Sequence, residues 1–166
     1  MQRCINEGWE TTGVDDLSNG HMAFVPGGGR IIIDDFAGPQ VLANIKRGKY
    51  DIVFHLAAVP RVSYSVEHPI KTHDVNVTRT LELISACRDN VKRVVFASSS
   101  SVYGGAKLLP TAEGHPKFPK SPYALQKSII EDYLELFGSL YGLDSACMRF
   151  FNVFGPHQLG DSPYAT

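Results

Sequence analysis

Short runs of β-branched and aromatic residues recur along the chain, and between them apolar residues return at helical spacing. Apolar runs of about four to eight residues, bounded by turn residues, are typical of buried strands in parallel sheets. Residues 50–56 and 91–97 are predicted to be buried strands of this kind. The full pattern predicts strands over residues 9–14, 30–33, 50–56, 91–97 and 143–151.

Helices are predicted between these strands, over residues 1–8, 40–47, 69–90 and 123–141. The third of them has apolar residues at helical intervals between Val75 and Ala86, with polar residues between them. Gly142 is placed to end the last helix. Strands that alternate with helices in this way predict an α/β fold with a doubly wound parallel sheet.

Glycine and proline mark the loops. The run Pro26–Gly29 is rich in glycine, as phosphate-binding loops are, but it has the wrong spacing and precedes another predicted strand. We therefore expect a flexible, hairpin-like loop there. Further loops are predicted over residues 59–65 and 104–119.

Composition and charge exclude several classes of protein. At 166 residues the chain is long enough for one domain with a substantial core. A net charge of −1 gives no general attraction to nucleic acid or to an anionic membrane. Cys4, Cys87 and Cys147 are odd in number and far apart, so neither a disulfide framework nor a metal site is expected. The sequence has no apolar run of about 18 residues and no signal-peptide pattern, so a cytoplasmic protein is expected.

One predicted helix begins with a chemical pair. Ser121 and Pro122 suit a helix start and place Tyr123 and Lys127 four residues apart on one face. An ammonium group beside a phenol favours the phenolate and lowers the phenol pKa towards neutrality, as a general base requires. Such a pair alone is more often surface decoration. The serines at residues 98–101 favour function, because they follow a predicted strand and ligands of open α/β sheets bind at the carboxyl ends of strands.

Three motifs, in this order, resemble the extended short-chain dehydrogenase/reductases that act on nucleotide sugars. They are FASSSSVYG at residues 96–104, SPYALQK at 121–127 and RFFNVFGP at 149–156. The resemblance covers essentially the whole chain and is greatest to UDP-N-acetylglucosamine and UDP-glucose 4-epimerases. It implies a Rossmann-like NAD-binding domain over residues 1–154 and the start of a substrate-binding region over 155–166. The opening strand and glycine-rich turn of such domains are missing from the pattern, so we expect a chain truncated at both ends.

The resemblance implies NAD as the cofactor. In the family, an acidic residue at the end of this strand holds the adenosine ribose hydroxyls, and Asp15 occupies that position. An acidic residue there also repels the 2′-phosphate of NADP. Asn76 corresponds to an asparagine that supports the cofactor pocket through hydrogen bonds, whereas His55 is interpreted as structural. The other cofactor-binding residues that the resemblance implies are Asp35, Phe36, Leu56, Ala57, Ala58, Tyr123, Lys127 and Phe151.

The same resemblance assigns catalytic roles to Ser99, Tyr123 and Lys127. Tyr123 is expected to take the proton of the sugar 4-hydroxyl as C4 passes a hydride to NAD, which gives a transient 4-keto sugar. Ser99 would share that proton, and Lys127 would lower the phenol pKa and hold the nicotinamide ribose. The implied contacts of the UDP-sugar substrate are Ser99, Ser100, Ser101, Tyr123 and Asn152, with Val62 and Ser63 as further candidates.

Alternatives stay open from sequence. Related dehydratases have an Asp-Glu pair where Ser100 and Ser101 stand, which favours epimerisation over dehydration and decarboxylation. The alternative from another class is a catalytically silent nucleotide-binding fragment, and we expect little or no turnover from the 166 residues alone. The resemblance implies a homodimer through a four-helix bundle. A sheet that lacks its first strand would also be poorly stable or self-associate.

Overall fold

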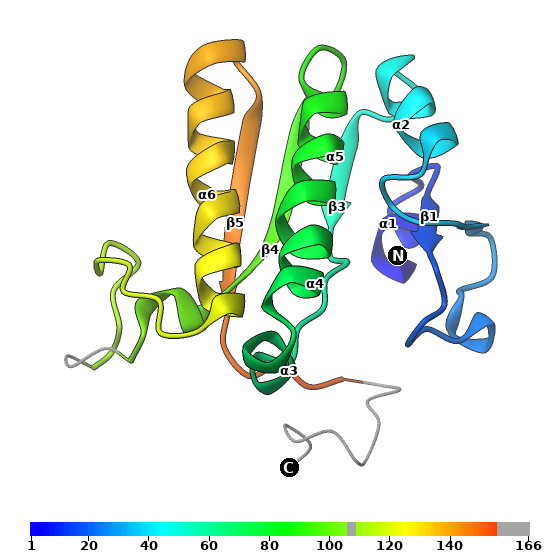
Figure 1. Cartoon of the computed structure of the whole chain (residues 1–166). Helices are drawn as coiled ribbons and strands as arrows, with labels where there is room; N and C mark the ends of the chain where they lie inside the picture. The colour runs from blue at the N-terminus through cyan, green and yellow to red at the C-terminus, as the bar shows by residue number, and fades with distance from the viewer. Residues whose placement is uncertain (106–108, 156–166) are drawn as a thin grey trace.

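The computed structural model describes residues 1–105 and 109–155, which form two parallel sheets with helices packed beside them (Figure 1). The first sheet pairs β1 (Thr12–Asp15) with β2 (Arg30–Ile33). The second has the order β3-β4-β5, where β3 is Ile52–His55, β4 is Arg93–Ser99 and β5 is Asp144–Phe150. The pairings β1–β2, β3–β4 and β4–β5 are all parallel. The expected Rossmann-like α/β fold is confirmed, and all five predicted strands are present.

The connection between β1 and β2 corrects one prediction. A hairpin-like loop was expected at residues 26–29, but the two strands run in the same direction, with Thr12 opposite Arg30 and Asp15 opposite Ile33. Parallel neighbours need a crossover instead of a tight turn. The crossover contains the 3-10 helix η1 (Met22–Phe24), and the glycine run forms a turn at its end.

Three helices lie where the sequence predicts them: α1 (Gln2–Asn6), α2 (Pro39–Lys46) and α6 (Pro122–Tyr141). Gly142 ends α6 with a φ of +73°, the left-handed conformation that favours glycine at this position. In the described part of the chain, no helix is both long enough and apolar enough to cross a membrane. The expected start of a substrate-binding region lies outside the described residues except for Gly155.

Two helical predictions need correction. The segment predicted as one helix over residues 69–90 ends at Cys87 and consists of α4 (Pro69–His73), the π-helical segment η2 (Asp74–Arg79) and α5 (Thr80–Cys87). The loop predicted over residues 59–65 is wrong in its second half, because Val62–Glu67 form helix α3.

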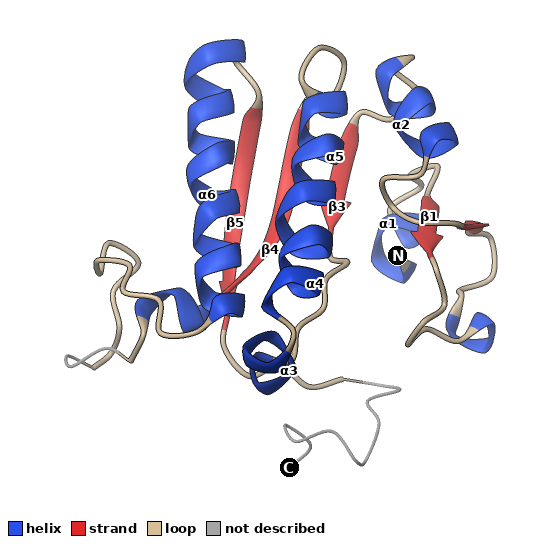
Figure 2. Cartoon of the chain, viewed as in Figure 1, coloured by secondary structure: helices blue, strands red, loops and turns tan. Residues whose placement is uncertain are grey.

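The core lies between the sheets and the helices α2, α5 and α6, with α5 and α6 side by side in front of β4 and β5 (Figure 2). Val94 and Phe96 of β4 point into this core. Successive strand residues face opposite sides, and on the other side Phe54, Met148 and Phe150 are 40% to 47% exposed. The predicted burial of the strand within residues 50–56 therefore holds on one face, where Val53 packs against the core and His55 is buried, and fails on the other, where Phe54 is exposed.

Candidate active site

The carboxyl ends of the parallel strands carry most of the residues that the sequence singled out. Ligands of open parallel sheets bind at this edge, so these residues belong to one candidate site. From β1 to β5 they are Asp15, then Asp35 and Phe36, then Leu56, Ala57 and Ala58, then Ser99, and finally Phe151 and Asn152.

Ser99 is the last residue of β4 and precedes the 3-10 helix η3 (Ser100–Tyr103). Its Oγ accepts the Ser101 backbone N–H at 3.2 Å and the Ser101 hydroxyl at 2.9 Å. The chain leaves η3 at Gly104, where the φ is +65° and a Cβ would lie 1.8 Å from the Phe118 carbonyl oxygen. The contacts with Ser101 hold the Ser99 hydroxyl at the strand end. The left-handed backbone and the close Phe118 carbonyl leave room only for glycine at residue 104.

Helix α6 brings Tyr123 and Lys127 to the site on one buried face. Ser121 caps the helix by accepting the Ala124 N–H at 3.2 Å, and Pro122 occupies the first turn, where no N–H is needed. The Tyr123 N–H donates to the buried Ser65 hydroxyl at 3.1 Å. Tyr123 is 9% exposed and Lys127 is 3% exposed, so the pair does not decorate the surface.

The Lys127 ammonium group lies among a backbone carbonyl and two aromatic rings. Its Nζ donates to the Ala97 carbonyl oxygen at 2.7 Å and lies 4.6 Å from the Phe96 ring centre and 5.8 Å from that of Tyr123. Burial lowers the pKa of Lys127 to about 8, so it remains mostly protonated at neutral pH. The Lys127 cation therefore lies beside the Tyr123 ring, next to the strand end that carries Ser99.

An amide clamp holds the segment that follows β3. Asn76 accepts the Val59 N–H at 2.8 Å, and its amide group donates to the Val59 carbonyl oxygen at 3.1 Å and to Gln126 Oε1 at 2.9 Å. The Gln126 amide in turn donates to Thr72 Oγ1 at 3.0 Å. Asn76 lies in the wide π-helical turn η2, a feature that often marks functional sites. The clamp fixes the backbone beside β3 against α6.

The acidic residue at the end of β1 faces solvent. Asp15 is exposed, and its Oδ1 accepts the Leu17 N–H at 2.7 Å in a tight turn. The turn passes close to the carboxylate, because a Cβ on Gly20 would lie 2.9 Å from Asp15 Oδ1. An exposed carboxylate held in this way can accept hydrogen bonds from hydroxyl groups of a ligand.

The residues after β2 have partners inside the protein. Asp35 Oδ1 accepts the Ala37 N–H at 2.7 Å, and Oδ2 lies 2.9 Å from Arg79 Nε. The Phe36 ring packs 4.8 Å from the His55 ring. Both side chains are partly buried and have these internal partners, and their contacts with a cofactor remain a prediction.

The segments after β3 and β5 are accessible at the same edge. Leu56 is 65% exposed and Phe151 is 63% exposed, and Ala57 and Asn152 are exposed as well. The small side chains after β3 leave the backbone open to close approach by a ligand. Of the two further candidates, Ser63 is exposed and Val62 is partly buried, and both lie on α3 instead of in a loop.

A model described as the NAD dependent epimerase/dehydratase family matches residues 1–164. The chain belongs to this family. The resemblance seen in its three motifs is thereby confirmed.

Curated members of the family give the same assignment. A UDP-glucose 4-epimerase of Mycolicibacterium smegmatis is 36% identical over 165 residues, which cover 95% of this chain and 53% of the relative. A putative UDP-glucose 4-epimerase of Methanocaldococcus jannaschii is 32% identical over 160 residues, with coverages of 95% and 52%. The chain spans about half the length of the curated relatives it matches.

Solved structures from the family also match. The UDP-N-acetylglucosamine 4-epimerase of Methanobrevibacter ruminantium, in complex with UDP-N-acetylmuramic acid, is 40% identical with a TM-score of 0.85, over 95% of this chain and 52% of that one. The UDP-glucose 4-epimerase of Thermus thermophilus, in complex with NAD, is 32% identical with a TM-score of 0.87, over 99% and 54%.

Sequence reasoning missed three polar residues that this member of the family buries around the site, namely Ser65, Gln126 and Glu131. Glu131 had a detectable signal, because it continues the four-residue spacing of Tyr123 and Lys127 along α6. Ser65 had none, since its partner Tyr123 is 58 residues away in sequence.

His55 is a core residue, as the sequence suggested. Its Nε2 lies 2.9 Å from Thr80 Oγ1, and its ring packs between Phe36 and Phe96. Burial, with a smaller contribution from the positive charge of Lys127, lowers the pKa of His55 to about 3 from an ordinary value of 6.5. The ring is therefore neutral in the folded protein.

This depressed pKa predicts acid sensitivity. Between pH 6.5 and about 3 the unfolded chain binds a proton at His55 that the folded chain does not, so stability falls as the pH falls through this range. The expected loss between pH 7 and pH 5 is about 2 kcal/mol. Urea unfolding at the two pH values should show this loss shrinking in His55→Gln but persisting in the exposed control His21→Gln. Equal losses in both variants would contradict the assignment.

Proposed function

We propose that the whole protein is an NAD-dependent nucleotide-sugar 4-epimerase acting on UDP-glucose or UDP-N-acetylglucosamine, and that this chain contributes its catalytic residues. The observation that carries the proposal is the burial of Tyr123 and Lys127 on one face of α6, with Lys127 bonded to Ala97 at the end of the strand that carries Ser99. The names of the relatives support the substrate class.

The residues present fit an NAD molecule along the carboxyl edge of the sheets. Asp15 would accept the adenosine ribose hydroxyls, the open backbone at Leu56–Ala58 would lie beneath the dinucleotide, and Phe151 would lie near the nicotinamide. Lys127 has three N–H donors, of which one is directed to Ala97, so another can reach the nicotinamide ribose. When bound, NAD would supply a reversible hydride acceptor, so that the sugar passes through a 4-keto state.

The chain's own side chains would manage the proton. Tyr123 would remove the proton of the sugar 4-hydroxyl, with Lys127 stabilising the phenolate. Ser99 Oγ accepts two hydrogen bonds from Ser101, which leaves the Ser99 proton free to be donated to a ligand oxygen. Asn152 is proposed to contact the diphosphate side of the substrate. Because serines follow Ser99 where a dehydratase has an acid and a base, epimerisation is favoured over elimination.

The test is calorimetry of NAD and NADP with the 166-residue chain, followed by epimerase assays with the two UDP-sugars. We expect NAD to bind at micromolar concentration or tighter, NADP to bind more weakly, and Asp15→Asn to reduce the preference. Little turnover is expected from this chain by itself. If neither this chain nor a longer form of the protein binds NAD, the proposal fails; NAD binding without turnover in any form would favour the alternative of a silent nucleotide-binding module.

A further inference from the structure

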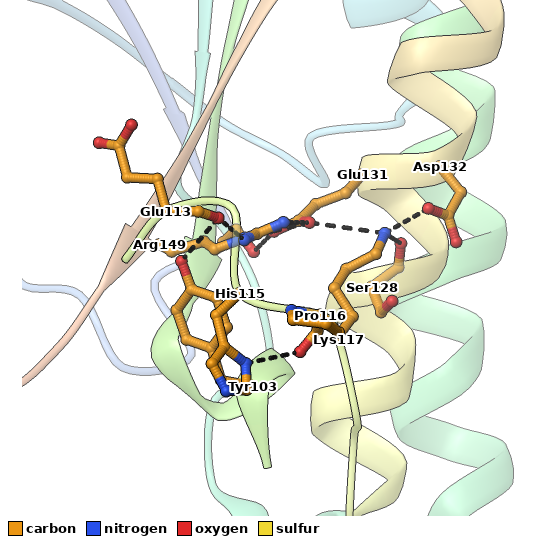
Figure 3. A network of polar contacts seen from close by, with 10 residues as sticks. Tyr103, Glu113, His115, Pro116, Lys117, Ser128, Glu131, Asp132 and Arg149 are labelled. Carbon is orange, nitrogen blue, oxygen red and sulfur yellow. Dashed lines mark hydrogen bonds and ion pairs between the residues drawn. The ribbon is translucent and has the colours of Figure 1, made fainter. Parts of the chain in front are cut away.

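Glu131 is a buried carboxylate that the proposed reaction does not use. It lies on α6, one turn beyond Lys127, and is 7% exposed. Its Oε1 accepts the Ser98 hydroxyl at 2.5 Å. The Arg149 guanidinium contacts both carboxylate oxygens, with Nη2 2.8 Å from Oε2 (Figure 3). Lys117 Nζ lies 3.6 Å from Oε2.

These partners keep the carboxylate ionised. Burial alone would raise the pKa of Glu131, but the hydrogen bonds from Arg149 and Ser98, helped by the positive charges of Arg149 and Lys117, hold it below its ordinary value. The hydrogen bond to Glu131 likewise raises the pKa of Arg149. A buried charge of this kind is costly unless it is fully paired, so the geometry around it is tightly defined.

Arg149 and Glu131 also contact residues between η3 and α6. Arg149 Nη1 donates to the Glu113 carbonyl oxygen at 2.9 Å, and its guanidinium lies 4.8 Å from the Tyr103 ring centre (Figure 3). On the helix side, Lys117 pairs with Asp132. The contacts of Glu131 and Arg149 therefore link β4, β5 and α6 to residues of the segment that follows η3.

Two adjacent residues of β4 are tied to two residues of α6 that are one turn apart. Lys127 holds the Ala97 carbonyl group, and Glu131 holds the Ser98 side chain. Both ties lie immediately before Ser99, and Tyr123 is one turn before Lys127 on the same helix. The second tie restricts rotation of the strand end about the first, and so limits the orientations that the next residue, Ser99, can take.

We propose that Glu131 is a positioning residue: through the Ser98 hydroxyl and the Arg149 guanidinium it sets Ser99 at working distance from Tyr123. The inference rests on the proposed function for its effect on turnover, but its geometric content concerns this chain alone.

A matched pair of variants at Ser98 tests it. Ser98→Thr keeps the hydroxyl that Glu131 accepts, whereas Ser98→Val has nearly the same shape and lacks it. We measure hydrogen exchange of the Ser101 amide, whose N–H donates to Ser99 Oγ, in the 166-residue chain. Exchange should be about tenfold faster in Ser98→Val than in Ser98→Thr, and equal in the two variants across β1 and β2, because the disturbance is local.

Glu131→Gln provides an independent variant that keeps the shape and removes the charge. It should give the same local acceleration, and Ser98→Val should add less than about twofold to it, since the two residues act as one unit. In a form of the protein that turns over, Ser98→Val should lower kcat by up to about 10²-fold with KM little changed, and Ser98→Thr should recover most of the loss. Equal Ser101 exchange in the two Ser98 variants would overturn the inference whatever the turnover. If no form turns over, the proposed function fails and the exchange comparison still decides the positioning role.

Discussion

Replacement of Tyr123 by phenylalanine is expected to lower epimerase turnover by about 10²–10⁴-fold, the range typical of a lost general acid–base group. The ring is buried at the start of α6, and its N–H bond to Ser65 comes from the backbone, so phenylalanine should leave the helix in place. The Lys127 ammonium would still lie near the ring and bonded to Ala97. The loss should therefore fall mainly on kcat, with a smaller effect on NAD binding.

The measurement compares kcat and the NAD dissociation constant of Tyr123→Phe and Tyr133→Phe, each made in a longer form of the protein that turns over. Tyr133 lies ten residues later on the same helix and packs against the core, so it controls for the loss of a phenol hydroxyl elsewhere on α6. Retention of more than about a tenth of the turnover in Tyr123→Phe would remove Tyr123 from the role of base.

A strand supplied ahead of α1 is expected to convert a weakly cooperative chain that associates through its open edges into a stably folded one. In the described residues β1 pairs only with β2, and β3 pairs only with β4, so one edge of β1 and one edge of β3 are unpaired. Unpaired edges of this kind promote association. A strand followed by a glycine turn and α1 would form a right-handed βαβ unit with β1, and its free place is the edge of β1 that faces away from β2.

We would compare the 166-residue chain with a fusion that carries such a strand and turn, by sedimentation and by urea unfolding. The fusion should unfold in one steep transition. It should also bind NAD more tightly, because the glycine turn offers backbone N–H groups to the pyrophosphate. In a control fusion, two prolines in the added strand remove two of the N–H groups that would bond to β1. This fusion should behave like the unmodified chain. A sharp monomeric transition in the unmodified chain would show that the open edges carry no such cost.

Features encoded within a few residues could be predicted from sequence. The start of α6 needed only Ser121 and Pro122, and its end needed only Gly142. The strands were visible as apolar runs. Because all the described pairings are parallel, the predicted residues at the carboxyl ends lie at one edge of each sheet. The interpretation of His55 as structural also agrees with its aromatic surroundings.

Features that depend on distant partners could not be predicted. The direction of β2 relative to β1 depends on sheet pairing, so a glycine run that looked like a hairpin ends a crossover. Helix α3 is fixed by Ser65, whose hydroxyl donates to the Val62 carbonyl oxygen and accepts from Tyr123 in another part of the chain. The internal partners of Asp35 include Arg79, 44 residues later, and no local pattern announces that ion pair.

The wide turn at Asp74–Arg79 lies between α4 and α5 and changes the direction in which their side chains point around the helix axis. Before it, Thr72 meets Gln126, and within it Asn76 meets Val59; after it, Leu83 and Ile84 face the core. Each residue of a regular helix advances the side chains by about 100°, so deleting one residue here would restore a uniform helix and turn one of these sets away from its partners. The number of residues in this segment is therefore as important as their identity. An ideal helix in its place would lose either the hydrogen bonds of the amide clamp or the core packing of α5.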